Sequence, residues 1–220
     1  MKRELIITDD GSNSIYIPEM DETYHSTHGA IQEAKHVFIE QGLKRLGKTD
    51  IKILEMGLGT GLNVLLSAIE SERLNVKIDY VGIEAFPVES EIFSVLNYTL
   101  LIGEEHSSMF NKIHDIPWGS PFNINDHFIL TKNQIKIQNY LFKKESFDIV
   151  YYDAFGPRVQ SELWSVEVLE KIFESLKKGG FLVTYCAQGQ FKRNLKEVGF
   201  EVEVLPGPLG KREMTLAIRQ

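Results

Sequence analysis

The stretch LEMGLGTGLN, residues 54–63, places three glycines between one apolar run and the next. Gly57, Gly59 and Gly61 occupy the junction of a predicted strand and a predicted helix, where glycine lets the backbone approach a ligand and the helix N-terminus offers unpaired N–H groups. The spacing differs from the dinucleotide-binding fingerprint, which would need its third glycine at the position of Leu62. A tight turn with nothing bound is the alternative interpretation of the glycines alone.

The residues around this loop alternate between strand and helix patterns, which is typical of an α/β fold with a mostly parallel sheet and helices on both faces. The middle of the chain is less regular, and either 127–131 or 135–140 is a further strand. The short turn PGPLGKR, residues 206–212, predicts a closing hairpin and so an antiparallel final strand. The expected strands are 51–56, 78–86, 147–153, 180–187, 200–205 and 213–219, and the expected helices are 62–71, 88–101, 161–178 and 190–199.

The first part of the chain has a different pattern. Two apolar runs within residues 5–17 flank the turn sequence DDGSNS and predict a hairpin, and residues 25–43 carry apolar side chains at helical spacing. A chain of 220 residues fits one compact domain. We therefore expect an N-terminal hairpin and helix flank over residues 1–45 and a core over residues 46–220, within a single domain.

Composition narrows the function classes. The formal net charge of −7 argues against a protein that coats nucleic acid through a general basic surface. The C-terminal segment is nevertheless basic, and Lys192 and Arg193 fit either a local phosphate-binding patch or a solvated helix face. The single cysteine excludes an internal disulfide, and the N-terminus lacks the long apolar stretch of a signal peptide or membrane span. We expect a soluble, cytosolic protein.

Two acidic residues follow predicted strands. Glu84 comes after six mostly apolar residues, one βαβ unit beyond the glycine loop, where a carboxylate can accept both hydroxyls of an adenosine ribose. Asp153 ends the apolar run FDIVYYD, at the sheet edge where open α/β sheets bind ligands. The alternatives are a solvated strand end for Glu84 and a turn or N-cap aspartate for Asp153, although Ser161 is the better N-cap candidate for the next helix.

The glycine loop, Glu84 and the alternation together resemble the Rossmann-like class I S-adenosylmethionine-dependent methyltransferase fold. In that fold an acid at the position of Glu55 helps hold the methionine end of the cofactor. A narrower resemblance follows from YYDAFGPRVQSELW (151–164), GGFLVTYCAQGQFKRNLKEVGFEVE (179–203) and LPGPLGKREM (205–214). These runs are similar to the MnmD family, the stand-alone relatives of the methyltransferase domain of bifunctional MnmC. YHSTHGAIQEAKHVFIEQGL (24–43) and ILEMGLGTGLNVLL (53–66) fit the same family, so the resemblance covers nearly the whole chain.

The resemblance implies methylation of the exocyclic amine of 5-aminomethyl-2-thiouridine at the tRNA wobble position, with S-adenosylmethionine as cofactor and tRNA as partner. By position, it implies that Gly57, Gly59, Gly61 and Asn63 form the cofactor loop and that Glu84 contacts the ribose. It implies that Asp153 and Phe155 form the active-site edge, and that Lys211, Arg212 and Glu213 lie on a hairpin turn that faces the substrate. Tyr24, Gly29 and Glu33 would belong to an N-terminal motif over the cofactor.

Asp153 would meet a substrate amine. With an ordinary carboxylate pKa of about 3.9 it would be a weak base toward an alkylammonium, so we expect it to orient the amine and to stabilise the positive charge that grows on nitrogen. Bifunctional members have Asp-Gly-Phe-Ala-Pro where this chain has residues 153–157 as Asp-Ala-Phe-Gly-Pro, which alters the fine shape of the amine pocket. No flavin-dependent oxidase domain follows Gln220, so the substrate amine is expected to come from elsewhere.

Other signals carry less weight. His25, His28 and His36 lack a partner at ligand spacing, so we expect no metal site. Cys186 is expected to be a small apolar core residue. An enzymatic alternative is an aminopropyltransferase of the spermidine synthase kind, whose site would need further acids where this chain has Arg158. A non-catalytic subunit that binds cofactor and tRNA is the other alternative. For tRNA, we expect Lys192, Arg193, Lys211 and Arg212 to form the phosphate patch.

Overall fold

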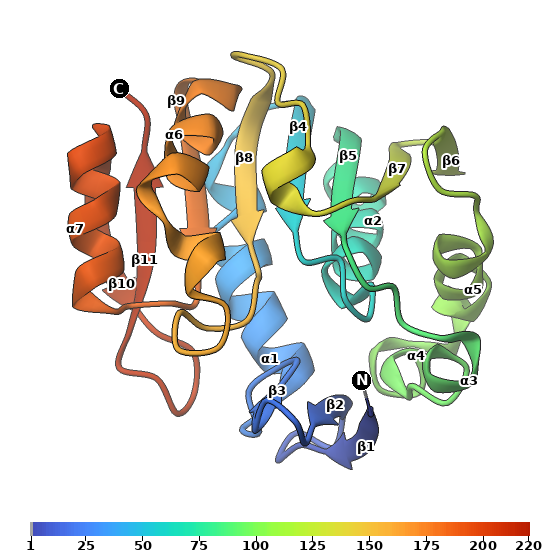
Figure 1. Ribbon diagram of the computed structural model, residues 1–220. Helices are drawn as coiled ribbons and strands as arrows, with labels where there is room; N and C mark the ends of the chain where they lie inside the picture. The colour runs from blue at the N-terminus through green and yellow to red at the C-terminus, as the bar shows by residue number, and fades with distance from the viewer. Residues whose placement is uncertain (1) are drawn as a thin grey trace.

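A mixed eight-stranded sheet forms the centre of the protein, which a computed structural model describes over residues 2–220 (Figure 1). The strand order is β10-β11-β9-β8-β4-β5-β7-β6. The inner strands β9, β8, β4, β5 and β7 are parallel, whereas β11 is antiparallel to both of its neighbours and β6 to β7. The strands are β4 Asp50–Met56, β5 Lys77–Glu84, β6 Pro121–Asn125, β7 Phe128–Gln134, β8 Phe147–Tyr152, β9 Leu176–Thr184, β10 Glu201–Pro206 and β11 Glu213–Ile218.

Strand β8 shows why the sheet needs cover on both faces. All six of its residues are buried, and from Ile149 to Tyr152 the side chains alternate between two apolar clusters, as the two-residue period of a strand requires. Ile149 and Tyr151 pack into one cluster, and Val150 and Tyr152 into the other. A run without polar alternation therefore becomes a central strand.

Helices cover the two faces separately. The first cluster contains residues of α1 Ala30–Ala34, the π-helical turn η1 Lys35–Glu40, α2 Leu62–Leu74 and α5 Ser107–Asp115. The second contains residues of α6 Val166–Ser175 and α7 Gly189–Val198. Shorter helical segments complete the chain: η2 Leu43–Arg45, α3 Ser90–Phe93, α4 Tyr98–Ile102, η3 Glu104–His106, η4 Ile137–Asn139 and η5 Ser161–Trp164.

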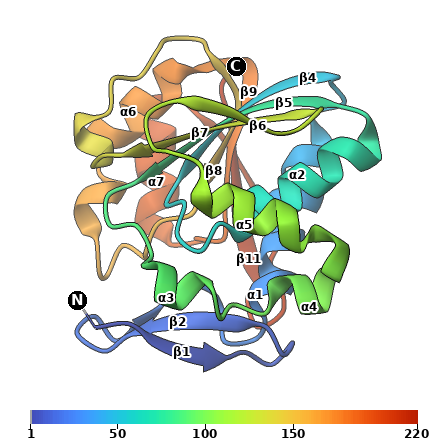
Figure 2. The ribbon, with the colours of Figure 1, turned by 90° about the vertical axis from the view of Figure 1, so that its right-hand side faces the viewer.

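A small antiparallel sheet stands apart from the large one and consists of β1 Glu4–Ile7, β2 Asn13–Ile17 and β3 Glu22–Thr23. In Figure 2 it lies along the underside of the molecule, beside α3 and α4. Its attachment is polar: the Asn13 backbone N–H donates to Asn97 Oδ1 at 2.7 Å, and the Asn97 N–H returns a bond to Asn13 Oδ1 at 3.0 Å. Arg3 adds an ion pair to Glu89.

Most of the sequence-based expectation agrees with this architecture: the α/β class, the mostly parallel sheet, the N-terminal hairpin and the antiparallel final strand are confirmed. Of the two candidate middle strands, 127–131 is the one that forms, as β7, and 135–140 contains a 3-10 turn. Strands β3 and β6 were not expected. The division of the chain into a flank (1–45) and a core stays a prediction.

Two expected helices are wrong. The segment 88–101 is broken into α3 and α4, with Asn97 directly before α4. The segment 161–178 is a 3-10 turn followed by α6, and the strand β9 already begins at Leu176. Ser165, not Ser161, occupies the N-cap position of α6.

The chain order reverses at β4, because β5 and β7 follow it on one side and β8 and β9 on the other. Parallel strands end at a common edge, so Met56, Glu84 and Tyr152 bring the loops that follow them together there. Ligands of open α/β sheets bind at such a reversal point. Among the described residues, no helix is long and apolar enough to cross a membrane.

Candidate active site

A pocket of about 850 Å³ opens at this edge of the sheet. The loops after β4, β5 and β8 form its floor, and residues from the small N-terminal sheet close it from the other side. The volume lies in the range of small-molecule sites in proteins. Its lining includes Met20, Tyr24, His25, Gly57, Gly59, Thr60, Asn63, Glu84, Phe86, Ile137, Asp153, Phe155, Val159 and Tyr185.

The glycine loop is held in a conformation that other residues resist. Gly57, Gly59 and Gly61 have φ angles of 89°, 50° and 74°, in the left-handed region. At Gly57 a Cβ would also overlap the backbone carbonyl oxygen of Asp153. The Asp153 N–H in turn donates to the Met56 carbonyl at 3.0 Å. The glycine at position 57 therefore lets the loops after β4 and β8 lie in direct contact.

Glu84 is fixed by backbone donors. Its Oε2 accepts from the Gly59 N–H at 3.0 Å and its Oε1 from the Phe86 N–H at 2.8 Å. Each carboxylate oxygen keeps a further lone pair. A carboxylate held in this way can accept hydroxyl groups of a ligand in the pocket without first having to order itself.

Asn63 joins two carboxylates. Its Nδ2 amide donates to Glu55 Oε1 and to Asp153 Oδ2, both at 2.8 Å. Glu55 Oε2 and Asn63 Oδ1 are buried without a hydrogen-bond partner among the described residues. Burial, with the charge of Asp153 as a smaller cause, raises the pKa of Glu55 despite the bond from Asn63. Asn63 lines the pocket, so its unpartnered Oδ1 is an acceptor suited to a donor such as an ammonium group.

The Asp153 carboxyl group lines the pocket and is strongly perturbed. Burial, followed by the negative charge of Glu33, raises its pKa to about 7, against the opposing effects of Asn63 and Lys211. The expectation of an ordinary carboxylate is therefore wrong, and its physical cause is removal from water. Asp153 Oδ1 makes no hydrogen bond within residues 2–220 and remains available to a ligand.

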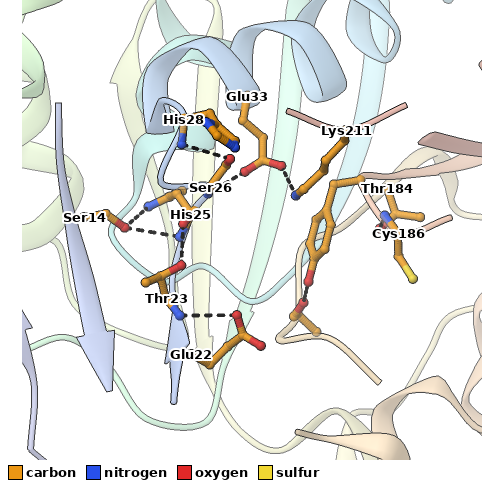
Figure 3. Close-up of polar contacts among 12 residues, drawn as sticks. Ser14, Glu22, Thr23, His25, Ser26, His28, Glu33, Thr184, Cys186 and Lys211 are labelled. Atoms are coloured by element: carbon orange, nitrogen blue, oxygen red, sulfur yellow. Dashed lines mark hydrogen bonds and ion pairs between the residues drawn. The ribbon is translucent and has the colours of Figure 1, made fainter. Parts of the chain in front are cut away.

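Tyr24 and His25 directly follow β3 of the N-terminal sheet and form part of the pocket wall. The Tyr24 ring faces Gly59 and meets the Phe155 ring edge-on, at a centroid distance of 5.1 Å. Burial raises the pKa of Tyr24 to about 12. His25 contacts Ser14 Oγ at 3.0 Å (Figure 3). It also contacts Thr60 Oγ1 at 3.4 Å. Burial lowers the pKa of His25 to about 4. A neutral imidazole thus connects β2 to the glycine loop.

Glu33 does not line the pocket, although the family resemblance implied a place for it beside the cofactor. Its Oε2 accepts from the Ser26 N–H at 2.7 Å, and its Oε1 accepts from Lys211 Nζ (Figure 3). The Lys211 ammonium also lies 4.0 Å from the centre of the Tyr185 ring, and the Tyr185 hydroxyl donates to the Ala154 carbonyl at 2.7 Å. A continuous set of contacts therefore runs from α1 to the backbone beside Asp153.

The other residues expected to bind substrate or tRNA do not all lie in one place. Lys211, Arg212 and Glu213 line a second pocket that adjoins the first. Lys192 is paired with Glu213 at 3.3 Å and does not line either pocket. Arg193 bonds Gln190 on its own helix, at 2.7 Å.

The histidines have ordinary roles. His28 pairs with Asp9 at 3.0 Å, and His36 Nε2 lies 2.9 Å from the Pro206 carbonyl. Residues 2–220 contain no group of three or more His, Cys, Asp or Glu side chains placed to hold a metal ion. Cys186 is free and buried.

Sequence reasoning missed several residues of the pocket wall, among them His25, Met20 and Tyr185. Tyr185 follows β9 at the same sheet edge as Asp153, so its position after an apolar strand was a usable signal. Met20 and His25 lie on either side of β3, and they reach the pocket wall because the small sheet packs against the core. That packing depends on tertiary contacts, which the sequence pattern does not show.

The sheet with its antiparallel closing hairpin, the glycine loop after β4, and the carboxylates Glu84 at the end of β5 and Asp153 after β8 define an α/β protein of the class I methyltransferase fold. A family model described as S-adenosyl-L-methionine-dependent methyltransferase matches residues 107–220, more than half of the chain. The protein belongs to this family.

Individual relatives agree. The tRNA 5-methylaminomethyl-2-thiouridine biosynthesis bifunctional protein MnmC of Cupriavidus necator is 30% identical over 218 residues, which cover 92% of this chain and 32% of the relative. The chain thus spans about a third of the length of that curated relative. The structure of MNMC2 from Aquifex aeolicus superposes with a TM-score of 0.81 at 23% identity, covering 100% of this chain and 70% of that one. Spermidine synthase from Thermotoga maritima shares the fold at a TM-score of 0.54 and 13% identity, with coverage of 95% and 69%.

The residues present fit the cofactor of this family. The unpartnered Asn63 Oδ1, in the pocket wall, would accept a hydrogen bond from the ammonium of its methionine part, and the fixed Glu84 carboxylate would accept its ribose hydroxyls. Glu55 does not line the pocket and holds the Asn63 amide in place. Phe86 and Ile137 supply apolar surface in the same pocket for the adenine ring. The glycine backbone completes the cradle.

Proposed function

We propose that this protein transfers a methyl group from S-adenosylmethionine to the exocyclic amine of 5-aminomethyl-(2-thio)uridine at the wobble position of tRNA. The observation that carries the proposal is Asp153, a carboxyl group with a raised pKa in the wall of the cofactor pocket, where a second pocket adjoins the first. The resemblance to MnmC, which is named for the biosynthesis of tRNA 5-methylaminomethyl-2-thiouridine, supports the choice of substrate.

The protein's own groups account for the proton. S-adenosylmethionine, when bound, supplies the electrophilic methyl group. As the N–CH₃ bond forms, the S–CH₃ electron pair goes to sulfur and the nitrogen must give up a proton. An alkylammonium has a pKa of about 10.4, so a base with a pKa of about 7 faces a deficit of about three powers of ten, against about six for an ordinary aspartate.

Asp153 would therefore both align the amine and accept its proton. Oδ2 is held by Asn63, which leaves Oδ1 to accept a hydrogen bond from the substrate nitrogen. Positive charge develops on that nitrogen during transfer, and the neighbouring carboxylate stabilises it. The Tyr185 hydroxyl donates to the Ala154 carbonyl and so helps to hold the backbone beside Asp153 in position for substrate.

An aminopropyltransferase would share the fold, as the Thermotoga structure shows, but the family match is to methyltransferases. A non-catalytic subunit would have no use for a carboxyl group held at a pKa of about 7 in the pocket wall.

The test measures transfer of labelled methyl from S-adenosylmethionine to tRNA isolated from cells stalled at the aminomethyl stage. Unmodified transcript, and a diamine assayed with the aminopropyl donor, serve as controls for the substrate. We expect label on the stalled tRNA only, and Asp153→Asn should lower turnover by about 10²–10³-fold with little change in cofactor affinity.

Asp79→Asn is the matched variant, because Asp79 is a surface aspartate paired with Lys52 on the same sheet. It should retain full activity. Label on unmodified transcript, or aminopropyl transfer to the diamine, would overturn the proposal.

A further inference from the structure

The second pocket, of about 1000 Å³, shares Met20, Val159 and Tyr185 with the cofactor pocket. Its remaining lining comes from the loop after β8, the loop after β9, the β10–β11 turn with Glu213 at the start of β11, and residues 21–22. The second pocket therefore adjoins the cofactor pocket and shares part of its wall.

Some of the cationic side chains near this pocket already form an ion pair with an acid, and others do not. Lys211 is paired with Glu33, and Lys192 with Glu213. Arg158 and Arg212 both line the pocket and are exposed, and neither has an ion-pair or side-chain hydrogen-bond partner among residues 2–220. The lining as a whole holds three cations (Arg158, Lys211 and Arg212) and three acids (Asp21, Glu22 and Glu213), so the anion-binding capacity of this hollow lies in the two guanidinium groups that have no partner.

The two arginines stand on different segments. Arg158 belongs to the loop that follows Asp153, and Arg212 to the β10–β11 turn. A planar guanidinium can donate two parallel hydrogen bonds to a phosphate, so each arginine can hold one phosphate group. The acids Asp21 and Glu22 line the same pocket and repel phosphate from their part of the wall.

We propose that Arg158 and Arg212 bind the two phosphates that flank the target nucleotide, so that RNA docks over the second pocket and its base passes the shared wall of Met20 and Tyr185 toward Asp153. This inference rests on the proposed function and names the RNA contact of the same site. It replaces the expected patch of Lys192, Arg193, Lys211 and Arg212, of which only Arg212 is uncompensated and lines a pocket.

The experiment uses the full chain and an anticodon stem-loop RNA that carries 5-aminomethyluridine at the wobble position. Binding is measured at several salt concentrations for the wild type, Arg158→Gln, Arg212→Gln and the double variant. Substitution of an arginine that contacts a phosphate should reduce the magnitude of the slope of log K against log salt by about one. The same substitution should weaken RNA binding about tenfold at low salt. Calorimetric titration with S-adenosylmethionine shows that each variant is folded.

Lys178→Gln is the matched control. Lys178 is an exposed cation without a charged partner among the described residues, and it lies near the amino end of β9, away from Tyr185. Its loss should leave the slope unchanged. An unchanged slope in the double variant, or an equal change in Lys178→Gln, overturns the inference.

The failure of this inference and that of the proposed function are distinguishable. If the wild type methylates the stem-loop and the double variant keeps its slope, the function stands and the arginine site is wrong. If the double variant loses its slope while the wild type transfers no methyl to the RNA, the RNA site stands and the proposed reaction is wrong.

Discussion

The two aspartates at the ends of β8 show how environment decides the role of a side chain. Asp148 accepts from Lys48 Nζ at 2.6 Å, from Lys177 Nζ at 2.7 Å and from the Lys52 N–H at 2.8 Å. Although burial opposes ionisation, these bonds lower its pKa. Asp153 has one amide donor and an acidic neighbour, so burial and Glu33 raise its pKa. The first aspartate stabilises the sheet, and the second is kept reactive.

This difference predicts the stability of Asp153→Asn. The pKa of Asp153 is about 7 in the folded protein and 3.8 in the unfolded chain. Between these pH values the folded protein therefore binds more protons than the unfolded chain does. Its free energy of unfolding falls as the pH rises through this range. The variant lacks this loss. We expect its Tm to exceed that of the wild type by a few degrees at pH 8, and the difference to shrink as the pH falls from about 7 toward 4.

The measurement is thermal unfolding of both proteins without cofactor, across that pH range. Titrating groups that do not interact with Asp153 cancel in the comparison. A variant that is less stable than the wild type at every pH would contradict the assigned pKa.

Among the structural elements, the β4–α2 loop can be tested with a matched pair of glycines. Gly57 and Gly179 have φ angles of 89° and 75°, but a Cβ would overlap the Asp153 carbonyl at Gly57 and meets nothing within 4 Å at Gly179. We expect Gly179→Ala to cost about 1–2 kcal/mol of stability through backbone strain alone and to bind cofactor normally. Gly57→Ala should cost more and weaken cofactor binding at least about tenfold, because the two loops must separate.

Chemical denaturation and calorimetric titration with S-adenosylmethionine measure the two effects. Equal stabilities and equal cofactor affinities for the two variants would show that the close approach of the loops is unimportant.

Periodicity predicted the parallel core because buried strands and amphipathic helices must repeat at their own periods. Periodicity failed over 88–101, where the apolar pattern continues through Asn97 but the helix is interrupted. Asn97 exchanges hydrogen bonds with Asn13 and donates to the Gly11 carbonyl at 2.9 Å, and these long-range bonds replace local helical ones. It failed again at Leu176, because Lys177 extends to reach Asp148. Contacts between distant segments decided both cases.

The site was predictable to the level of the sheet edge. Strand ends and a glycine loop placed Glu55, Glu84 and Asp153 near one another, because parallel strands end together. Spacing could not reveal that Asn63 bridges two of these acids, or that Glu33 faces Lys211. Those partners depend on side-chain directions across elements. Whether each residue holds cofactor or RNA stays a prediction.

At the scale of the whole molecule, segments from opposite ends of the chain meet beside the pocket. The ion pair of Glu33 and Lys211 joins α1 to the β10–β11 turn, and His28 packs against Gly210 of the same turn (Figure 3 shows the ion pair). Glu33 is buried, and Lys211 is its charged partner, so loss of either side chain leaves the other without its ion pair. Lys211 is thus expected to position Tyr185 and to have no direct part in RNA binding.

A double-mutant cycle tests this link. Glu33→Gln and Lys211→Met should each destabilise the protein, and the double variant should be more stable than the sum of the two losses predicts, with a coupling of about 1–3 kcal/mol. Lys211→Met should lower turnover while it keeps the salt dependence of RNA binding, in contrast to Arg212→Gln. Additive losses of stability, or a reduced salt slope in Lys211→Met, would contradict the positioning role.

The meeting of the two chain ends also matters during synthesis. A growing chain that has emerged only through β8 already contains the glycine loop, Glu84 and Asp153, but it lacks Tyr185 and the turn whose Lys211 holds that ring against the pocket wall. The wall is therefore completed only when residues near 211 have left the ribosome. A chain that has not reached residue 185 therefore lacks part of the pocket wall.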